Sequence, residues 1–205
     1  MSADHTEATV FFGYGSNLWK HQMRERCPKS KYLGIARLKG YKWIINERGY
    51  ANVVQIVSKE DDDEKKKHEY SKEVWGLVYS LDKQDEKNLD GNEGVPRAYT
   101  KEWLQVDYWQ ADAGEDDVVA CQEEKAKKVN MLVYINRKQI SESKPKEEYI
   151  YRMNMGIEDA VEEGMPEEYV KQVMRNFIPE VEDEVVEEVV KEESVRFEAE
   201  KDRFT

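Results

Sequence analysis

Cysteine and histidine are scarce in this sequence, with two Cys and three His among 205 residues. Cys27 and Cys121 stand neither in a C-x-x-C pair nor beside a histidine, so we expect both to be reduced residues that serve packing. His5, His21 and His68 show no spacing typical of metal ligands. The sequence therefore predicts neither a metal site nor a histidine general base.

Long apolar runs and an excess of positive charge are also missing. The longest clear apolar run, residues 131–135, is far shorter than a membrane span of roughly 18 residues, and the N-terminus has no leader-like pattern. Acidic residues number 44 against 32 Lys and Arg, which gives a formal net charge of −12. Because binding to phosphates needs clustered Lys and Arg, we expect no nucleic-acid partner and no membrane partner. The missing span and leader pattern predict a cytoplasmic location.

The length of the chain is enough for one well-buried core and short for two. We predict a single domain over residues 1–205, with its core in residues 8–179. Residues 180–205 are acidic but keep valines at helical spacing, which predicts an acidic C-terminal helix or tail. Residues 58–72, where acids and lysines dominate, are predicted to form a surface loop.

β-Prone segments come first in the sequence and helical patterns follow. Strands are expected in residues 9–12, 32–35, 41–45, 53–57, 74–79, 103–109 and 129–135. From Pro145 onward apolar residues recur at helical spacing, and Gly164 and Pro166 separate two helices. Several curved strands followed by helices predict an α+β fold.

The most informative local feature is a turn that carries Gly13, Gly15, Ser16 and Asn17 between the first strand and a helical pattern. Glycine lets a ligand approach the backbone closely, and the N–H groups that open a helix have no internal partner, so the turn suits an anion. Leu18 stands where a dinucleotide motif and a nucleophile elbow need glycine, and the Gly-Lys-Ser/Thr of a P-loop is absent. A purely structural turn, with Asn17 as a helix cap, is the alternative.

A second feature is Glu93, which follows a short predicted helix opened by Asp82 and closed around Asp90 and Gly91. Glu93 then lies between that helix and a Gly-Val-Pro segment, so it is not part of a helical charge stripe. In a chain that is 37% charged, a lone glutamate of this kind is more often a plain surface acid than a functional one. The turn and Glu93 therefore have to be interpreted together.

Together, these two features resemble the γ-glutamylcyclotransferase family. Residues 14–17, Tyr-Gly-Ser-Asn, resemble the YGSN loop of that family, and residues 89–95 resemble the segment that bears its catalytic glutamate, here Glu93. Family-like segments continue in the same order at residues 36–38, 49–51, 74–78 and 155–169. The resemblance implies the γ-glutamylcyclotransferase-like fold, a small mixed β-barrel flanked by helices.

The reaction that the resemblance implies is the cyclisation of L-γ-glutamyl amino acids, in which the α-amine attacks its own γ-amide carbonyl. The products are 5-oxoproline and a free amino acid, and no metal or cofactor takes part. Glu93 is the implied general acid and base, because one carboxylate can remove a proton from the attacking amine and return it to the leaving amine. The backbone N–H groups of Gly15, Ser16 and Asn17 are expected to hold the substrate carboxylate or the oxyanion, with the choice between them open.

The resemblance also implies a set of substrate-binding residues: Tyr14, Gly15, Ser16, Asn17, Leu18, Tyr99, Tyr134 and Tyr149. For Tyr99, Tyr134 and Tyr149, ordinary packing with a satisfied hydroxyl explains the residue equally well. The segment before Tyr99 is shorter than a common form of the family, and this makes Arg97 a candidate for the pocket rim.

Two alternatives stay open. Ser16 and Asn17 favour the branch of the family that acts on γ-glutamyl amino acids, but Leu18-Trp19 resembles the glutathione-specific branch, which releases 5-oxoproline and Cys-Gly. The second alternative is a non-catalytic binding module on the same fold. For either enzyme the expected partner is a small γ-glutamyl peptide, and the oligomeric state, a homodimer included, is left open.

Overall fold

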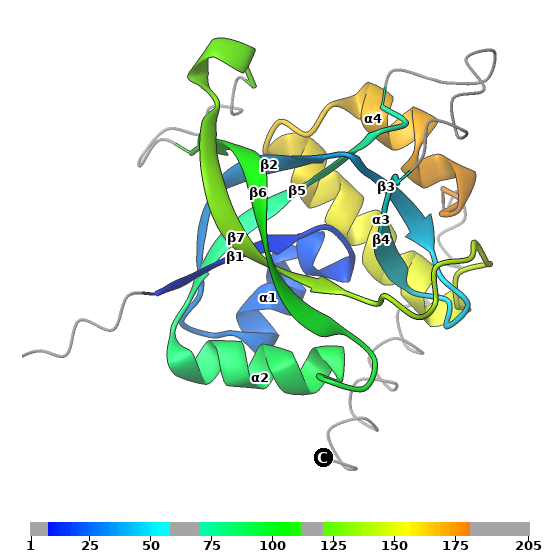
Figure 1. Cartoon of the computed structure of the whole chain (residues 1–205), viewed down its shortest axis with the longest axis horizontal. Helices are drawn as coiled ribbons and strands as arrows, with labels where there is room; N and C mark the ends of the chain where they lie inside the picture. Colours follow the sequence, from blue (N-terminus) through cyan, green and yellow to red (C-terminus); the bar gives the residue numbers. More distant parts are fainter. Residues whose placement is uncertain (1–7, 58–69, 112–120, 181–205) are drawn as a thin grey trace, which may run out of the picture.

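The computed structural model describes residues 8–57, 70–111 and 121–180, and a closed β-barrel forms its centre (Figure 1). The barrel strands are β1 (Thr9–Gly13), β2 (Lys31–Lys39), β5 (Glu73–Leu81), β6 (Thr100–Gln110) and β7 (Lys127–Ile135). Around the barrel they follow the order β1-β5-β2-β6-β7. The barrel is mixed, because β1 and β7 run parallel while the other neighbouring strands are antiparallel.

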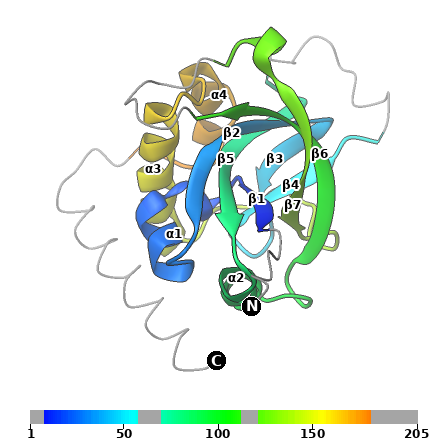
Figure 2. The same cartoon turned by 90° about the vertical axis from the view of Figure 1, so that its left-hand side faces the viewer.

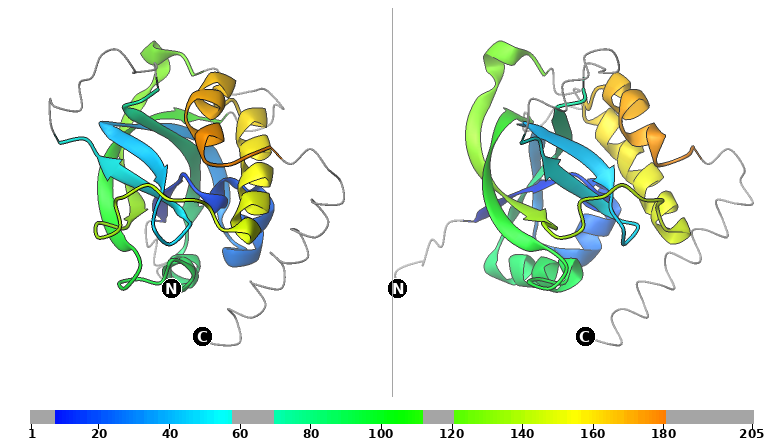
Figure 3. Two further views of the ribbon diagram at one scale, coloured as in Figure 1. Left: turned by 90° about the vertical axis from the view of Figure 1, so that its right-hand side faces the viewer. Right: turned by 45° about the vertical axis from the view of Figure 1, so that its right-hand side comes forward.

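A separate two-stranded hairpin consists of β3 (Tyr41–Ile45) and β4 (Ala51–Gln55), joined by a turn of residues 46–50. The hairpin packs on the end of the helical region, where the rings of Trp43 and Phe177 meet edge to face with centroids 5.7 Å apart. Figure 3 shows the hairpin beside α3 (Glu147–Glu162) and α4 (Glu167–Gln172).

Two further helices, α1 (Lys20–Arg26) and α2 (Lys83–Glu93), complete the helical layer. Figure 2 shows α1 and α3 along one side of the barrel and α2 beneath one end of it. Short 3-10 turns are η1 (Ser16–Leu18), η4 (Glu123–Lys125) and η5 (Met174–Asn176). The helix α3 approaches η1 closely because residue 156 is glycine: a Cβ on Gly156 would lie 2.9 Å from the Cβ of Leu18.

Apolar side chains from every wall of the barrel form the core. Phe12, Ile35, Leu77 and Leu132, from four different strands, are fully buried. The second half of β7 is buried at every position, as expected for a strand that is covered on both faces. Because the sheet closes on itself, its strands bury apolar surface without leaving an exposed edge.

The predicted α+β fold, a small mixed barrel flanked by helices, is confirmed, and each expected strand overlaps a strand of the structure. The helix expected after Pro166 is short, since α4 ends at Gln172 and η5 follows it. Cys27 is buried and Cys121 half-buried, and both are free thiols, as expected.

The predicted loop and the predicted C-terminal helix or tail lie almost wholly outside the described residues. Among the helices that the structure describes, none is long and apolar enough to cross a membrane.

Candidate active site

Glu93 is the last residue of α2 and not a loop residue after it. The helix begins as predicted, with the side chain of Asp82 capping its first turn. It continues past Gly91 because Gly94 is the residue that adopts the left-handed conformation, with φ of 66°, and ends the helix. The prediction that Glu93 lies outside the helix was therefore wrong.

The end of α2 is fixed to the barrel by Asp90, which lies almost one helical turn before Glu93. Asp90 Oδ1 accepts a hydrogen bond from the Tyr134 hydroxyl at 2.7 Å, and Asp90 Oδ2 lies 3.1 Å from the ammonium nitrogen of Lys101. Lys101 and Tyr134 are partners in the register of β6 and β7. Two neighbouring barrel strands therefore set the position of Glu93.

The glycine-rich loop follows β1 and leads directly into η1. The backbone N–H of Ser16 donates to the hydroxyl oxygen of Tyr149 at 3.1 Å, and the N–H of Ala51 donates to the same oxygen at 3.3 Å. A Cβ on Gly15 would lie 2.9 Å from that oxygen and 3.1 Å from the Cβ of Ala51. Glycine at position 15 therefore allows the loop to reach Tyr149, and one of the three N–H groups expected to face an anion already has a partner.

Asn17 connects this loop to Glu93. Its Nδ2 donates to Glu93 Oε1 at 2.8 Å, and its Oδ1 accepts from Gln22 Nε2 at 3.1 Å and from Arg26 Nη1 at 3.0 Å. Because two donors hold the amide oxygen, the amide nitrogen faces Glu93. The alternative role of Asn17 as a helix cap is not seen, since neither η1 nor α1 begins with a side-chain cap.

The loop, the end of α2 and several phenols surround a cavity of about 140 Å³. The charged residues on its wall are Arg26, Arg48, Glu93 and Arg152. The wall thus has an excess of positive charge, although the whole chain has a formal net charge of −12. Such a cavity favours an anionic ligand. In the part of the chain that the structure describes, no group of three or more His, Cys, Asp and Glu is placed to hold a metal ion.

The four predicted tyrosines all line the cavity, but they use their hydroxyl groups differently. Three of them donate to protein oxygens: Tyr14 to the carbonyl of Tyr134 at 2.6 Å, Tyr99 to the carbonyl of Ala51 at 2.8 Å, and Tyr134 to Asp90. Tyr149 accepts two N–H groups, and no acceptor for its own proton is present among the described residues. Burial raises the pKa of Tyr149 to about 12, so its hydroxyl keeps that proton at neutral pH and can donate it to a ligand.

Two of the residues expected at the site do not line the cavity. Leu18 is fully buried and does not line the cavity, because η1 turns its side chain toward α3. Arg97 is exposed and is not part of the wall either. Instead Arg26, Arg48 and Arg152 supply the positive charges. No motif marked these arginines, since they come from α1, the β3–β4 turn and α3.

Part of the chain is similar in sequence to known proteins. Residues 73–173 match the AIG2-like family, a range that includes Glu93 but not the glycine-rich loop. Over 96 residues the chain is 29% identical to the gamma-glutamylcyclotransferases of mouse and human. Each match covers 43% of this chain and 46% of the relative, so less than half the length of these relatives is matched.

Solved structures share the fold over most of the chain. A gamma-glutamyl cyclotransferase superimposes with a TM-score of 0.60 and 22% identity, covering 91% of this chain and 99% of that one. A yeast gamma-glutamyl cyclotransferase described as specific to glutathione has a TM-score of 0.50 and 11% identity, covering 84% of this chain and 98% of that one. At such identities the likeness concerns the fold, and it agrees with the barrel and its flanking helices.

Proposed function

We propose that this chain, which belongs to the γ-glutamylcyclotransferase-like superfamily, is an enzyme that converts L-γ-glutamyl amino acids to 5-oxoproline and a free amino acid. The observation that carries the proposal is the contact between Asn17 and Glu93. This contact holds the Glu93 carboxylate beside the glycine-rich loop, on the wall of a cavity that favours anions. A carboxylate is a group suited to proton transfer.

The substrate fits the charges of this cavity. A γ-glutamyl dipeptide carries two carboxylates and one ammonium group, and the wall offers Arg26, Arg48 and Arg152 against Glu93. A confined substrate folds so that its α-amine meets its own γ-carbonyl carbon. Well-oriented intramolecular attack of this kind supplies about 7 to 11 kcal/mol of the barrier, so positioning is a large part of the catalysis.

Glu93 acts first as a base and then as an acid. It takes a proton from the α-ammonium group, and the amine nitrogen forms a new C–N bond to the γ-carbonyl carbon, whose oxygen becomes an oxyanion. Glu93 then gives that proton to the amide nitrogen, the old C–N bond breaks, and the carbonyl reforms in the lactam ring. Glu93 takes the second proton from the ring nitrogen and passes it to the released amine. The α-nitrogen loses two protons and the leaving nitrogen gains two, so the reaction balances without water or an oxidant.

Tyr149 is the donor that we assign to the oxyanion. Its hydroxyl accepts the N–H groups of Ser16 and Ala51 and keeps its proton for the cavity. Hydrogen bonds in a chain polarise one another, so the two N–H groups strengthen Tyr149 as a donor. The loss of an oxyanion donor typically costs about 10²- to 10³-fold in rate.

Incubation of the purified protein with γ-glutamyl-L-alanine and with glutathione, followed by measurement of 5-oxoproline, tests the proposal. We expect turnover of γ-glutamyl-L-alanine and slower turnover of glutathione. Faster turnover of glutathione would support the glutathione-specific alternative. Calorimetric binding of γ-glutamyl-L-alanine without any 5-oxoproline would contradict the proposed activity and support a binding module.

A further inference from the structure

The three arginines on the cavity wall differ in their partners. Arg26 donates to Asn17, and Arg152 Nη2 pairs with Glu148 at 2.8 Å. In the described part of the chain, Nη1 of Arg48 is buried and has no hydrogen-bond partner. A buried donor without an acceptor is costly, and a ligand oxygen in the cavity would remove that cost.

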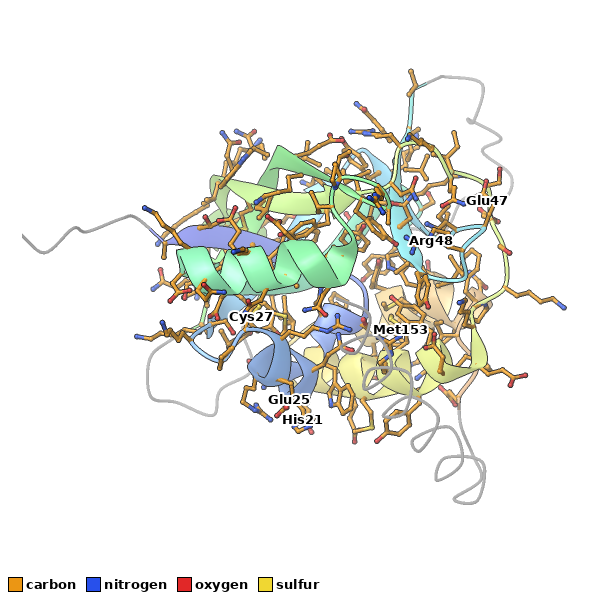
Figure 4. The ribbon with its side chains drawn as sticks, turned by 90° about the horizontal axis from the view of Figure 1, so that it is seen from below. His21, Glu25, Cys27, Glu47, Arg48 and Met153 are labelled. Carbon is orange, nitrogen blue, oxygen red and sulfur yellow. The ribbon has the colours of Figure 1, made fainter. Side chains whose placement is uncertain are left out.

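Arg48 is held in place by its surroundings. Its backbone N–H donates to Asn46 Oδ1 at 3.0 Å within the β3–β4 turn, and Figure 4 shows Arg48 toward the middle of the molecule and Glu47 at its edge. The guanidinium carbon lies 5.6 Å from the ring centroid of Tyr50 and 5.8 Å from that of Tyr99. The rings favour a cation here, and a planar guanidinium binds a carboxylate through two parallel hydrogen bonds.

Arg48, on the β3–β4 turn, and Glu93, at the end of α2, both affect the pKa of the Tyr99 phenol. Burial raises the pKa of Tyr99, the negative charge of Glu93 raises it further, and the positive charge of Arg48 lowers it. Both charges therefore lie near Tyr99. The γ-glutamyl half of the substrate, which reacts, has to lie at Glu93. Arg48, on the β3–β4 turn, is therefore left to bind the amino acid half, which is released.

We propose that Arg48 binds the free carboxylate of the amino acid that is released, an inference that rests on the proposed function. In a γ-glutamyl amino acid, only the amide nitrogen and one carbon separate this carboxylate from the reacting carbonyl, so one cavity can hold both. γ-Glutamylamines lack the carboxylate. Arg48 is then a specificity residue that selects γ-glutamyl amino acids and takes no part in the bond changes.

The test compares γ-glutamyl-L-alanine with γ-glutamyl-ethylamide, because the two differ only in this carboxylate. The ratio of their kcat/KM values, from 5-oxoproline formation, is measured for the wild type, Arg48→Gln and Arg48→Lys. Arg97→Gln is the matched control, since Arg97 is exposed and away from the cavity wall.

We expect the wild type to prefer γ-glutamyl-L-alanine by about 10-fold or more, in line with hydrogen bonds to charged groups. Arg48→Gln should bring the ratio close to one while turnover of the ethylamide stays near that of the wild type. Arg48→Lys should give an intermediate ratio, and Arg97→Gln the ratio of the wild type. If thermal unfolding shows that Arg48→Gln is not folded, the ratio of Arg48→Lys decides.

Two results would overturn the assignment while leaving the proposed function intact. One is a wild type that turns over both substrates equally well. The other is an Arg48→Gln variant that loses both activities by the same factor, which would place Arg48 on the glutamyl carboxylate instead. A wild type that forms 5-oxoproline from neither substrate would contradict the proposed function itself, and the assignment of Arg48 with it.

Discussion

The side-chain nitrogen of Asn17 lies 2.8 Å from Oε1 of Glu93, although the two residues are 76 positions apart in the sequence. Asn17 comes from the loop after β1, and Glu93 from the end of α2. Gln22 and Arg26 hold the amide oxygen from the other side, so the amide presents its donor to the carboxylate. The contact thus orients the carboxylate that we propose as the base.

Replacement of Asn17 by Asp tests this contact, because it keeps the shape of the side chain but sets a second carboxylate beside Glu93. We expect kcat/KM for γ-glutamyl-L-alanine to fall at least about tenfold at neutral pH. The acid limb of the pH–rate profile should also move to higher pH, since a like charge disfavours the ionised form of a carboxylate. Asn17→Ala removes the donor without adding charge, so its acid limb should stay nearer that of the wild type. An Asp variant with the wild-type profile would show that the contact is not used in catalysis.

Gly15→Ala should disturb the loop, since the added Cβ would lie 2.9 Å from the Tyr149 hydroxyl and 3.1 Å from the Cβ of Ala51. We expect at least about a tenfold loss of kcat/KM, which corresponds to roughly 1.4 kcal/mol. Gly91→Ala is the matched control, because a Cβ there meets nothing within 4 Å inside α2. It should leave the rate unchanged and raise the free energy of unfolding by about 0.5 to 1 kcal/mol. Equal kinetics for the two variants would argue against a role for the loop in binding.

Tyr149→Phe and Tyr99→Phe each remove one hydroxyl from the cavity wall. The Tyr149 hydroxyl proton is free for a ligand, whereas that of Tyr99 is donated to the carbonyl of Ala51. Tyr149→Phe should therefore lower kcat by about 10²-fold, and Tyr99→Phe by much less. The kcat values of the two variants are compared by steady-state kinetics, and thermal unfolding confirms that both variants are folded. A greater loss from Tyr99→Phe would contradict the assignment of the oxyanion donor.

The buried phenol of Tyr149 should make stability depend on alkaline pH. Burial raises its pKa from 10 to about 12, so the folded chain holds the phenol proton more tightly than the unfolded chain. Its contribution to the free energy of unfolding is complete below about pH 10 and is lost as the pH rises toward 12. Urea unfolding between pH 8 and about pH 11 should show a smaller loss for Tyr149→Phe than for the wild type. Equal losses would mean that Tyr149 does not titrate in this way.

Local patterns in the sequence predicted the α+β fold, and the resemblance to a known family implied the barrel and pointed to the loop and Glu93 as the two main parts of the candidate site. Alternating strands, the glycine-rich loop and a glutamate before Gly-Val-Pro are all visible along the chain. The exact end of α2 was missed, since Gly91 and Gly94 are both plausible helix ends and only the fold shows which one has positive φ. Arg48 was missed for another reason. In the sequence it is an ordinary turn residue, and only the packing of the β3–β4 turn brings it to the cavity.

The most direct test of the proposed activity is the rate of 5-oxoproline formation by Glu93→Gln. Glutamine keeps the size of the side chain and can still accept the hydrogen bond of Asn17, but it cannot take and return a proton. Glu25→Gln is the control, because Glu25 lies exposed on α1, as Figure 4 shows. We predict that Glu93→Gln folds normally, binds γ-glutamyl-L-alanine and forms 5-oxoproline at least about 10²-fold more slowly than the wild type, with Glu25→Gln unaffected. Near wild-type turnover by Glu93→Gln would contradict the role of Glu93 and, with it, the proposed mechanism.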